Sequence, residues 1–199
     1  MKISKIAKLC KDAKLVCMTS TEAGLWIGNG NAVYFVPEFT NMDCDGIALA
    51  FGIDEKKKEK ISFTNLDMSG FNMKDIDPAE SLCEPMGINF WQEGDILRPY
   101  KTEAGVLCLV GSYLEPLRDE MEAREVYLRY TKDGKQYFAV KVGLMLYAIV
   151  MPAKGISFEF VEKLGEMYEM CKTAMELEEK RLEAEKAKAA EQIRMEDAK

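Results

Sequence analysis

The chain presents few side chains in the patterns that catalysis uses. Its 199 residues contain no histidine, which removes the commonest general base and the commonest metal ligand in proteins. Carboxylates are plentiful, but neighbouring pairs such as Asp119 and Glu120 are typical of a solvated helix face rather than of an apolar catalytic pocket. We therefore expect a protein that is not an enzyme and that uses no cofactor.

Two short motifs resemble sites for a metal ion or a phosphate group. Asn41, Asp43 and Asp45 match the first half of a calcium loop, but the twelfth position is Gly52, and no glutamate closes the site. We expect a turn whose side chains cap the next helix. The segment GNG at 28–30 lacks the helix that a dinucleotide loop requires, so it predicts a β-hairpin turn.

The six cysteines form no recognisable metal or redox motif. No two of them have the C-x-x-C spacing of zinc sites and thioredoxin-like proteins. Those in apolar surroundings are Cys10, Cys17, Cys108 and Cys171. We expect these four to be buried, reduced thiols, as in a cytosolic protein, and we expect no metal site.

A lysine stripe is the most suggestive charge pattern. Lys5, Lys8 and Lys11 lie on the polar side of a predicted helix near the N-terminus, and such a stripe can contact a phosphate backbone. The alternative is a helix that lysine merely keeps soluble. Because the formal net charge is −7, we expect any DNA-binding face to be local and to consist of these three residues.

The elements that carry these residues follow one pattern at both ends of the globular part. Residues 1–37 predict an amphipathic helix, three strands and a closing proline, and residues 113–152 predict the same order. The Asn-Gly pair at 29–30 and the Asp-Gly pair at 133–134 predict hairpins. The nearly all-apolar run 144–151 predicts a strand that is buried on both faces or central in a sheet. We expect an α+β fold with a mainly antiparallel sheet and two pseudo-repeated helix–β-hairpin–strand units.

The section between the two copies is less regular. Residues 45–53 predict a short helix, and the charged run 55–60 predicts a turn before a strand at 61–65. Residues 67–86 predict a loop with one helical turn after its proline. Further short strands are expected at 88–91, 96–100 and 106–110.

The chain changes character after Gly155. Ser157 can cap a helix that runs to about the last residue, and the apolar residues of this helix follow the alternating spacing of a seam. The seam consists of Val161, Leu164, Tyr168, Cys171 and Met175. It is expected to contact either the protein's own core or a partner, whereas residues 178–199 are expected to be solvated. We expect an α+β domain over residues 1–155 and a C-terminal helix over residues 156–199.

The repeated unit resembles the half-domain of DNA sliding clamps. The closing strand LMLYAIVMPAKG at 144–155 is similar to the terminal strand of that family. The resemblance implies that the helices face DNA through Lys5, Lys8 and Lys11, and that edge strands join neighbouring subunits.

A second resemblance covers more of the chain. The opening MKISKIAKLCK and the segments WIGNG at 26–30, LRPY at 97–100 and AVKVG at 139–143 are similar to uncharacterised prophage-encoded proteins of anaerobic Gram-positive bacteria. This resemblance implies a phage context and supplies no activity or site residues.

Together these patterns predict a non-enzymatic phage accessory protein with a clamp-like domain that binds DNA or a protein partner of DNA metabolism. The alternative is a structural or assembly protein that oligomerises through its C-terminal helix. We expect no signal peptide, because no apolar run with a small-residue cleavage site precedes the first predicted helix. The apolar run 144–151 is far shorter than the roughly 20 residues that a membrane span needs. We expect a cytoplasmic protein of the bacterial host cell with a protein partner or further copies of itself as partners, and without a membrane or a small-molecule substrate.

Overall fold

The computed structural model describes residues 1–40, 42–92, 94–154 and 156–196. It divides into two compact units, Met1–Gly155 and Ile156–Lys199, which we call unit 1 and unit 2. Unit 1 is an α+β body with a mainly antiparallel sheet, and unit 2 is a C-terminal helix.

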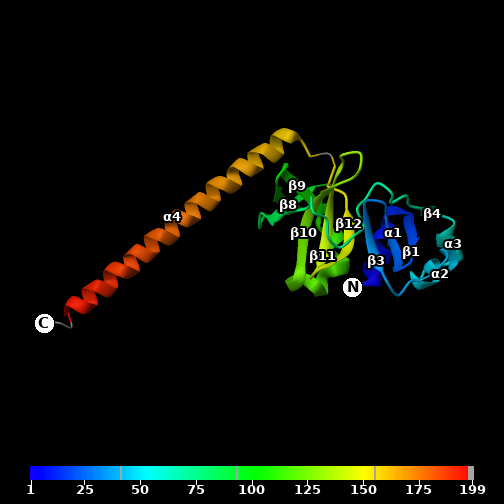
Figure 1. The fold of residues 1–199 in the computed structure, drawn as a ribbon, viewed down its shortest axis with the longest axis horizontal. Coiled ribbons are helices and arrows are strands. Elements are labelled where there is room, and N and C mark those ends of the chain that lie inside the picture. Colours follow the sequence, from blue (N-terminus) through cyan, green and yellow to red (C-terminus); the bar gives the residue numbers. More distant parts are fainter. Residues whose placement is uncertain (41, 93, 155, 197–199) are drawn as a thin grey trace. The chain divides into compact units, whose positions relative to one another are not determined.

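The larger sheet of unit 1 contains eight strands within the described residues, in the order β4-β1-β2-β3-β12-β11-β10-β5. The strands are β1 (Leu15–Thr21), β2 (Gly24–Gly28), β3 (Ala32–Val36), β4 (Ser62–Asn65), β5 (Ser81–Leu82), β10 (Arg124–Tyr130), β11 (Gln136–Val142) and β12 (Met145–Val150). The blue β3 and the yellow β12 lie side by side and join the first and last parts of unit 1 (Figure 1). β12 therefore has a central place, as its apolar sequence predicts.

Two glycine turns set the hairpins of this sheet. Gly30 has a φ of 85° between β2 and β3, and Gly134 has a φ of 80° between β10 and β11. Residues other than glycine rarely adopt such angles, so the Asn-Gly and Asp-Gly pairs are suited to these tight connections. The two hairpins predicted from the sequence are confirmed. The pairing of β1 with β4 is parallel, whereas the other pairings in the larger sheet are antiparallel.

Two helical segments pack side by side against one face of the larger sheet. They are α1 (Ile3–Ala13) and the 3-10 segment η1 (Gly111–Ala123). The backbone amide of Lys2 donates a hydrogen bond to the Pro116 carbonyl over 2.8 Å, and the hydroxyl of Tyr34 donates to the Tyr113 carbonyl over 2.7 Å. Ile6 on α1 and Leu117 on η1 are fully buried.

The second helical segment differs from the regular helix that its sequence predicts. It is a 3-10 segment with non-helical backbone at Leu117 and Glu120. Pro116 lies just before the first break, and it can neither donate a backbone hydrogen bond nor follow a regular α-helical turn without strain. Leu114 and Leu117 are buried as predicted, whereas the Met121 side chain lies outside the described part of the chain.

A smaller sheet covers part of the same face. It consists of β6 (Glu84–Pro85), β7 (Phe90–Gln92), β8 (Asp95–Thr102) and β9 (Gly105–Val110). β8 pairs with the other three strands. The ring of Tyr100 on β8 lies 5.8 Å from the ring of Phe138 on β11, so the two sheets share one apolar core. The sequence predicted β7, β8 and β9 within a few residues and missed β6.

Two short helices precede β4. In α2 (Cys44–Ala50), the Asp43 side chain accepts a hydrogen bond from the Gly46 amide over 2.8 Å, which confirms a cap in place of a calcium loop at this residue. Asn41 of the same motif lies outside the described residues. In α3 (Glu55–Lys58), the Asp54 side chain caps the Lys57 amide over 2.9 Å. The predicted charged turn is therefore one helical turn, because Asp54 caps it.

Unit 2 consists of α4 (Phe158–Glu196). The Phe160 amide donates a hydrogen bond to the Ser157 hydroxyl over 3.2 Å, so the predicted cap residue begins the helix. Residues 178–186 are exposed along its length, as predicted for this part of the tail. The side chains of residues 187–199 lie outside the described part.

Candidate functional site

The predicted lysine stripe lies on α1, at the surface of the helix layer. Lys8 is exposed, and Lys5 and Lys11 are half-buried. Carboxylates lie close to two of the three, because the Lys5 ammonium is 3.7 Å from Glu115 on η1 and the Lys8 ammonium is 3.0 Å from Asp12. The structure thus places the stripe on one accessible helix face with acidic groups close by.

The neighbouring segment η1 supplies most of this acidity. Lys2 pairs with Asp119 over 2.8 Å, and the N-terminal ammonium lies 3.6 Å from Glu120. Exposed ion pairs of this kind each contribute little to stability. They do lower the positive potential that a lysine stripe alone would create, and sequence reasoning could not pair the two segments in advance.

The predicted seam on α4 is exposed toward its distal end. Leu164 is buried, and Val161 and Tyr168 are half-buried, whereas Cys171 is exposed and Met175 has 66 % of its surface exposed. The expectation of a buried thiol is therefore wrong for Cys171, because a solvated helix carries it. Other large apolar side chains of α4 are also exposed, namely Phe158, Phe160, Met167, Met170, Leu177 and Leu182.

The remaining cysteines are free, and most of them are inert. Cys10, Cys17, Cys83 and Cys108 are buried. Burial raises the pKa of Cys10 and Cys83 to about 12 and that of Cys108 to about 11. Because the thiolate is the reactive form, these thiols are poor nucleophiles at neutral pH. In the described part of the chain, no group of three or more Cys, Asp or Glu side chains is arranged to hold a metal ion.

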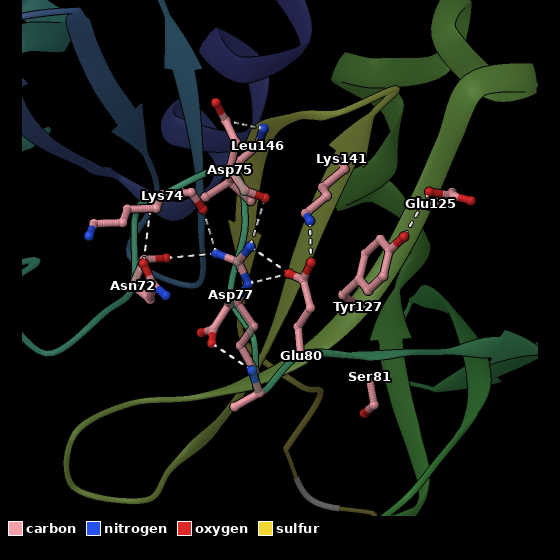
Figure 2. A network of polar contacts seen from close by, with 12 residues as sticks. Asn72, Lys74, Asp75, Asp77, Glu80, Ser81, Glu125, Tyr127, Lys141 and Leu146 are labelled. Carbon is pink, nitrogen blue, oxygen red and sulfur yellow. Dashed lines mark hydrogen bonds and ion pairs between the residues drawn. The ribbon is translucent and has the colours of Figure 1, made fainter.

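A buried polar network lies on the other face of the larger sheet, and the sequence did not predict it. Its centre is Arg129 on β10, whose side chain is fully buried. The Arg129 guanidinium donates to one Glu80 oxygen over 2.8 Å from Nε and 2.5 Å from Nη2. Lys141 on β11 pairs with the other Glu80 oxygen, so that Glu80 lies between two cations (Figure 2).

The same guanidinium holds the segment that leads to Glu80. Its remaining N–H groups donate to the carbonyls of Asn72, Lys74 and Asp75 over 2.8–3.1 Å, so all five donors of Arg129 are used. Asp75 in turn accepts a hydrogen bond from the Leu146 amide on β12 over 2.8 Å (Figure 2). The network fixes a long irregular segment onto the sheet and leaves no free donor on Arg129 for a ligand.

The turn that presents Glu80 is stabilised locally. The Asp77 carboxylate accepts a hydrogen bond from the Ala79 amide over 3.0 Å, and the Asp77 carbonyl accepts one from the Glu80 amide over 3.1 Å. The hydrogen bond from Ala79 holds the pKa of Asp77 below its usual value. We interpret this network as structural, because its charged groups are satisfied by one another and by the backbone.

Across the described residues, no helix is both long and apolar enough to cross a bilayer. Comparison of the chain with protein-family models, curated proteins and solved structures gives no match.

Proposed function

We propose that the chain is a non-enzymatic phage accessory protein whose unit 1 is built like a sliding-clamp domain and contacts DNA through α1. The observation that carries the proposal is the strand order β1-β2-β3-β12-β11-β10, with α1 and η1 together on one face. The first part of unit 1 has the order α1-β1-β2-β3, and the last part has the corresponding order η1-β10-β11-β12. That order supports two equivalent halves that meet at β3 and β12. A protein partner of DNA metabolism is the alternative occupant of the same face.

The charges on the helix layer support weak and salt-sensitive contact. Lys5, Lys8 and Lys11 face solvent at least in part, and lysines on a helix surface can replace the counterions of a phosphate backbone. Glu115 and Asp12 compete with phosphate for Lys5 and Lys8. The proposal therefore concerns sequence-independent binding at low salt, with no base contacts.

The first prediction tests the lysine stripe. The triple variant Lys5→Glu, Lys8→Glu and Lys11→Glu should weaken binding to duplex DNA at least about tenfold, because each substitution replaces a favourable phosphate contact with a repulsive one. The measurement is fluorescence anisotropy with a labelled duplex over a series of salt concentrations, in which the wild-type affinity should fall steeply as salt rises.

A matched control separates the stripe from net charge. Lys56→Glu, Lys57→Glu and Lys60→Glu change the charge by the same amount at two positions of α3 and at one position two residues beyond its end. This variant should retain most of the affinity. Equal losses in the two variants would mean that only net charge matters. No binding by the wild-type chain at low salt would reject DNA as the occupant and leave the protein partner.

A second candidate function is assembly through α4, and the exposed apolar side chains of that helix favour it. Met175 and Leu177 are 66 % and 62 % exposed, and exposed apolar clusters of this kind are typical of interaction surfaces. The seam from Val161 to Met175 has the spacing with which helices pack against one another. A second copy of α4 would bury the exposed members of the seam, Cys171 and Met175.

The second prediction tests this assembly. Deleting residues 157–199 should convert an oligomer to a monomer in light scattering, while the circular dichroism of unit 1 stays that of a folded protein. In the full chain, Cys171→Glu with Met175→Glu, at exposed seam positions, should dissociate the oligomer, whereas Met167→Glu with Met170→Glu, away from the seam, should not. A full chain that is monomeric at every concentration would exclude the assembly.

A further inference from the structure

A cleft in unit 1 is lined by residues outside α1. It has a volume of about 470 Å³, and its walls come from β5, β6, β8 and β10. Two arginine side chains line it, Arg98 from β8 and Arg124 from the start of β10. The net charge of the chain is −7. Two arginines that line one cleft therefore form a local positive region in an acidic protein.

The alternation of side chains along a strand explains why both arginines line the cleft. Successive residues of a strand point to opposite faces, so Arg98 shares a face of β8 with Tyr100, which packs in the core against Phe138. By the same rule, Arg124 shares a face of β10 with Val126, which belongs to the same core cluster. The two guanidinium groups therefore approach the cleft from different sheets.

Among the described residues, neither guanidinium has an acidic partner. Within the part of the chain that the structure describes, no carboxylate lies within 4 Å of Arg98 or Arg124, and the buried Nε of Arg98 lacks a hydrogen-bond acceptor. Burial lowers the pKa of Arg124, and the neighbouring Arg98 lowers it further, whereas Tyr100 and Glu115 oppose the shift. Two half-buried cations that repel each other leave a site that an anion would stabilise.

The nearby carboxylates, those of Glu125 and Glu115, interact with other groups. Glu125 also lines the cleft, but its carboxylate accepts a hydrogen bond from the Tyr127 hydroxyl over 2.9 Å, on the face of β10 opposite to Arg124. Glu115 lies 3.7 Å from Lys5 and 3.8 Å from Arg118, and it also raises the pKa of Arg124 from outside the cleft. Among the described residues that line the cleft, the two arginines thus outnumber the one carboxylate, Glu125.

We propose that this cleft binds a small organic phosphate, with its phosphate group on Arg98 and Arg124. Guanidinium groups from two directions suit a tetrahedral anion, whose terminal oxygens can accept from both at once. The apolar side chains of Leu82 and Ile88 line the same cleft and are partly exposed, so they can cover the organic part. The volume is within the range of about 300–1,000 Å³ that small-molecule sites have. A small-molecule ligand was not expected from the sequence.

The third prediction is measured by calorimetric titration of the full chain with inorganic phosphate, adenosine monophosphate and adenosine. We expect saturable binding of adenosine monophosphate, weaker binding of inorganic phosphate and none of adenosine. Arg98→Gln and Arg124→Gln should each weaken binding at least about tenfold, because each removes a charge-assisted contact. Arg118→Gln, which removes an exposed arginine outside the cleft, should leave the affinity unchanged.

The outcomes decide between the ligand classes. Failure to saturate up to about 10 mM ligand, or equal effects of the Arg98 and Arg118 variants, would overturn the site. A dicarboxylate of similar size that binds more tightly than the phosphate ester would overturn the assignment to phosphate. If an Arg→Gln variant fails to fold, the wild-type protein still provides a test, because its melting temperature should rise with phosphate and stay constant with chloride at the same ionic strength.

Discussion

Replacing Glu80 with alanine should lower the free energy of unfolding by about 3–5 kcal/mol. The substitution leaves Arg129 and Lys141 buried without the carboxylate that pairs with both of them. Burying an uncompensated charge is among the costliest changes that a fold can suffer, and here two cations lose their partner at once. The measurement is urea denaturation followed by circular dichroism.

The control is a glutamate of the same chain at an exposed position. Glu38→Ala should change the free energy of unfolding by no more than about 0.5 kcal/mol, because Glu38 is exposed. A second effect should accompany the Glu80 variant, since Arg129 also holds the carbonyls of Asn72 and Lys74. Limited proteolysis should then cut this segment faster. Equal stability of the Glu80 and Glu38 variants would show that water satisfies the two cations in the folded state.

The parts of the fold that the sequence predicted are those with local causes. The hairpins at 29–30 and 133–134 depend on glycines with positive φ, and the start of α4 depends on the Ser157 hydroxyl. The central place of β12 follows from its continuous apolar run, because such a strand needs cover on both faces. Each of these signals lies within a few residues of the element that it specifies.

The parts that the sequence could not predict depend on contacts between distant residues. Glu80 and Arg129 are 49 positions apart, and Arg129 occurs in REVYLRY, which reads as an ordinary strand. The two-residue strand β5 exists because it pairs with β10. The same limit applies to the sites. Lys5 could be selected from its spacing, but its pairing with Glu115 could not.

The charged side chains of this protein lie in three different surroundings. The network around Glu80 is closed, with each buried cation paired. The helix layer is mixed, because lysines of α1 face acids of η1. The cleft at Arg98 and Arg124 is open, with a buried donor that lacks an acceptor. Of these three surroundings, only the open one has two half-buried arginines without a carboxylate within 4 Å among the described residues, which is why a small-molecule anion is proposed there.

Replacing Phe138 with alanine should cost about 3–5 kcal/mol of the free energy of unfolding, because a fully buried aromatic ring is replaced by a cavity that the surrounding strands can only partly fill. The loss should also be local. The Phe138 ring on β11 lies 5.8 Å from the Tyr100 ring on β8, so its removal weakens the contact between the two sheets. Hydrogen exchange should become faster in β8 and β9 before it does in β1 and β2.

Two control variants and one binding measurement test the role of the Phe138 ring. Phe158→Ala removes the same side chain from a position that is 81 % exposed and should leave the stability of unit 1 unchanged. Phe138→Leu keeps most of the buried volume and should cost about 1 kcal/mol. Because Tyr100 is adjacent to Arg98 on the same face of β8, the alanine variant should also weaken phosphate binding at the cleft. A cost below about 1 kcal/mol for Phe138→Ala, or exchange that rises uniformly over all strands, would mean that the smaller sheet does not depend on this ring for its position.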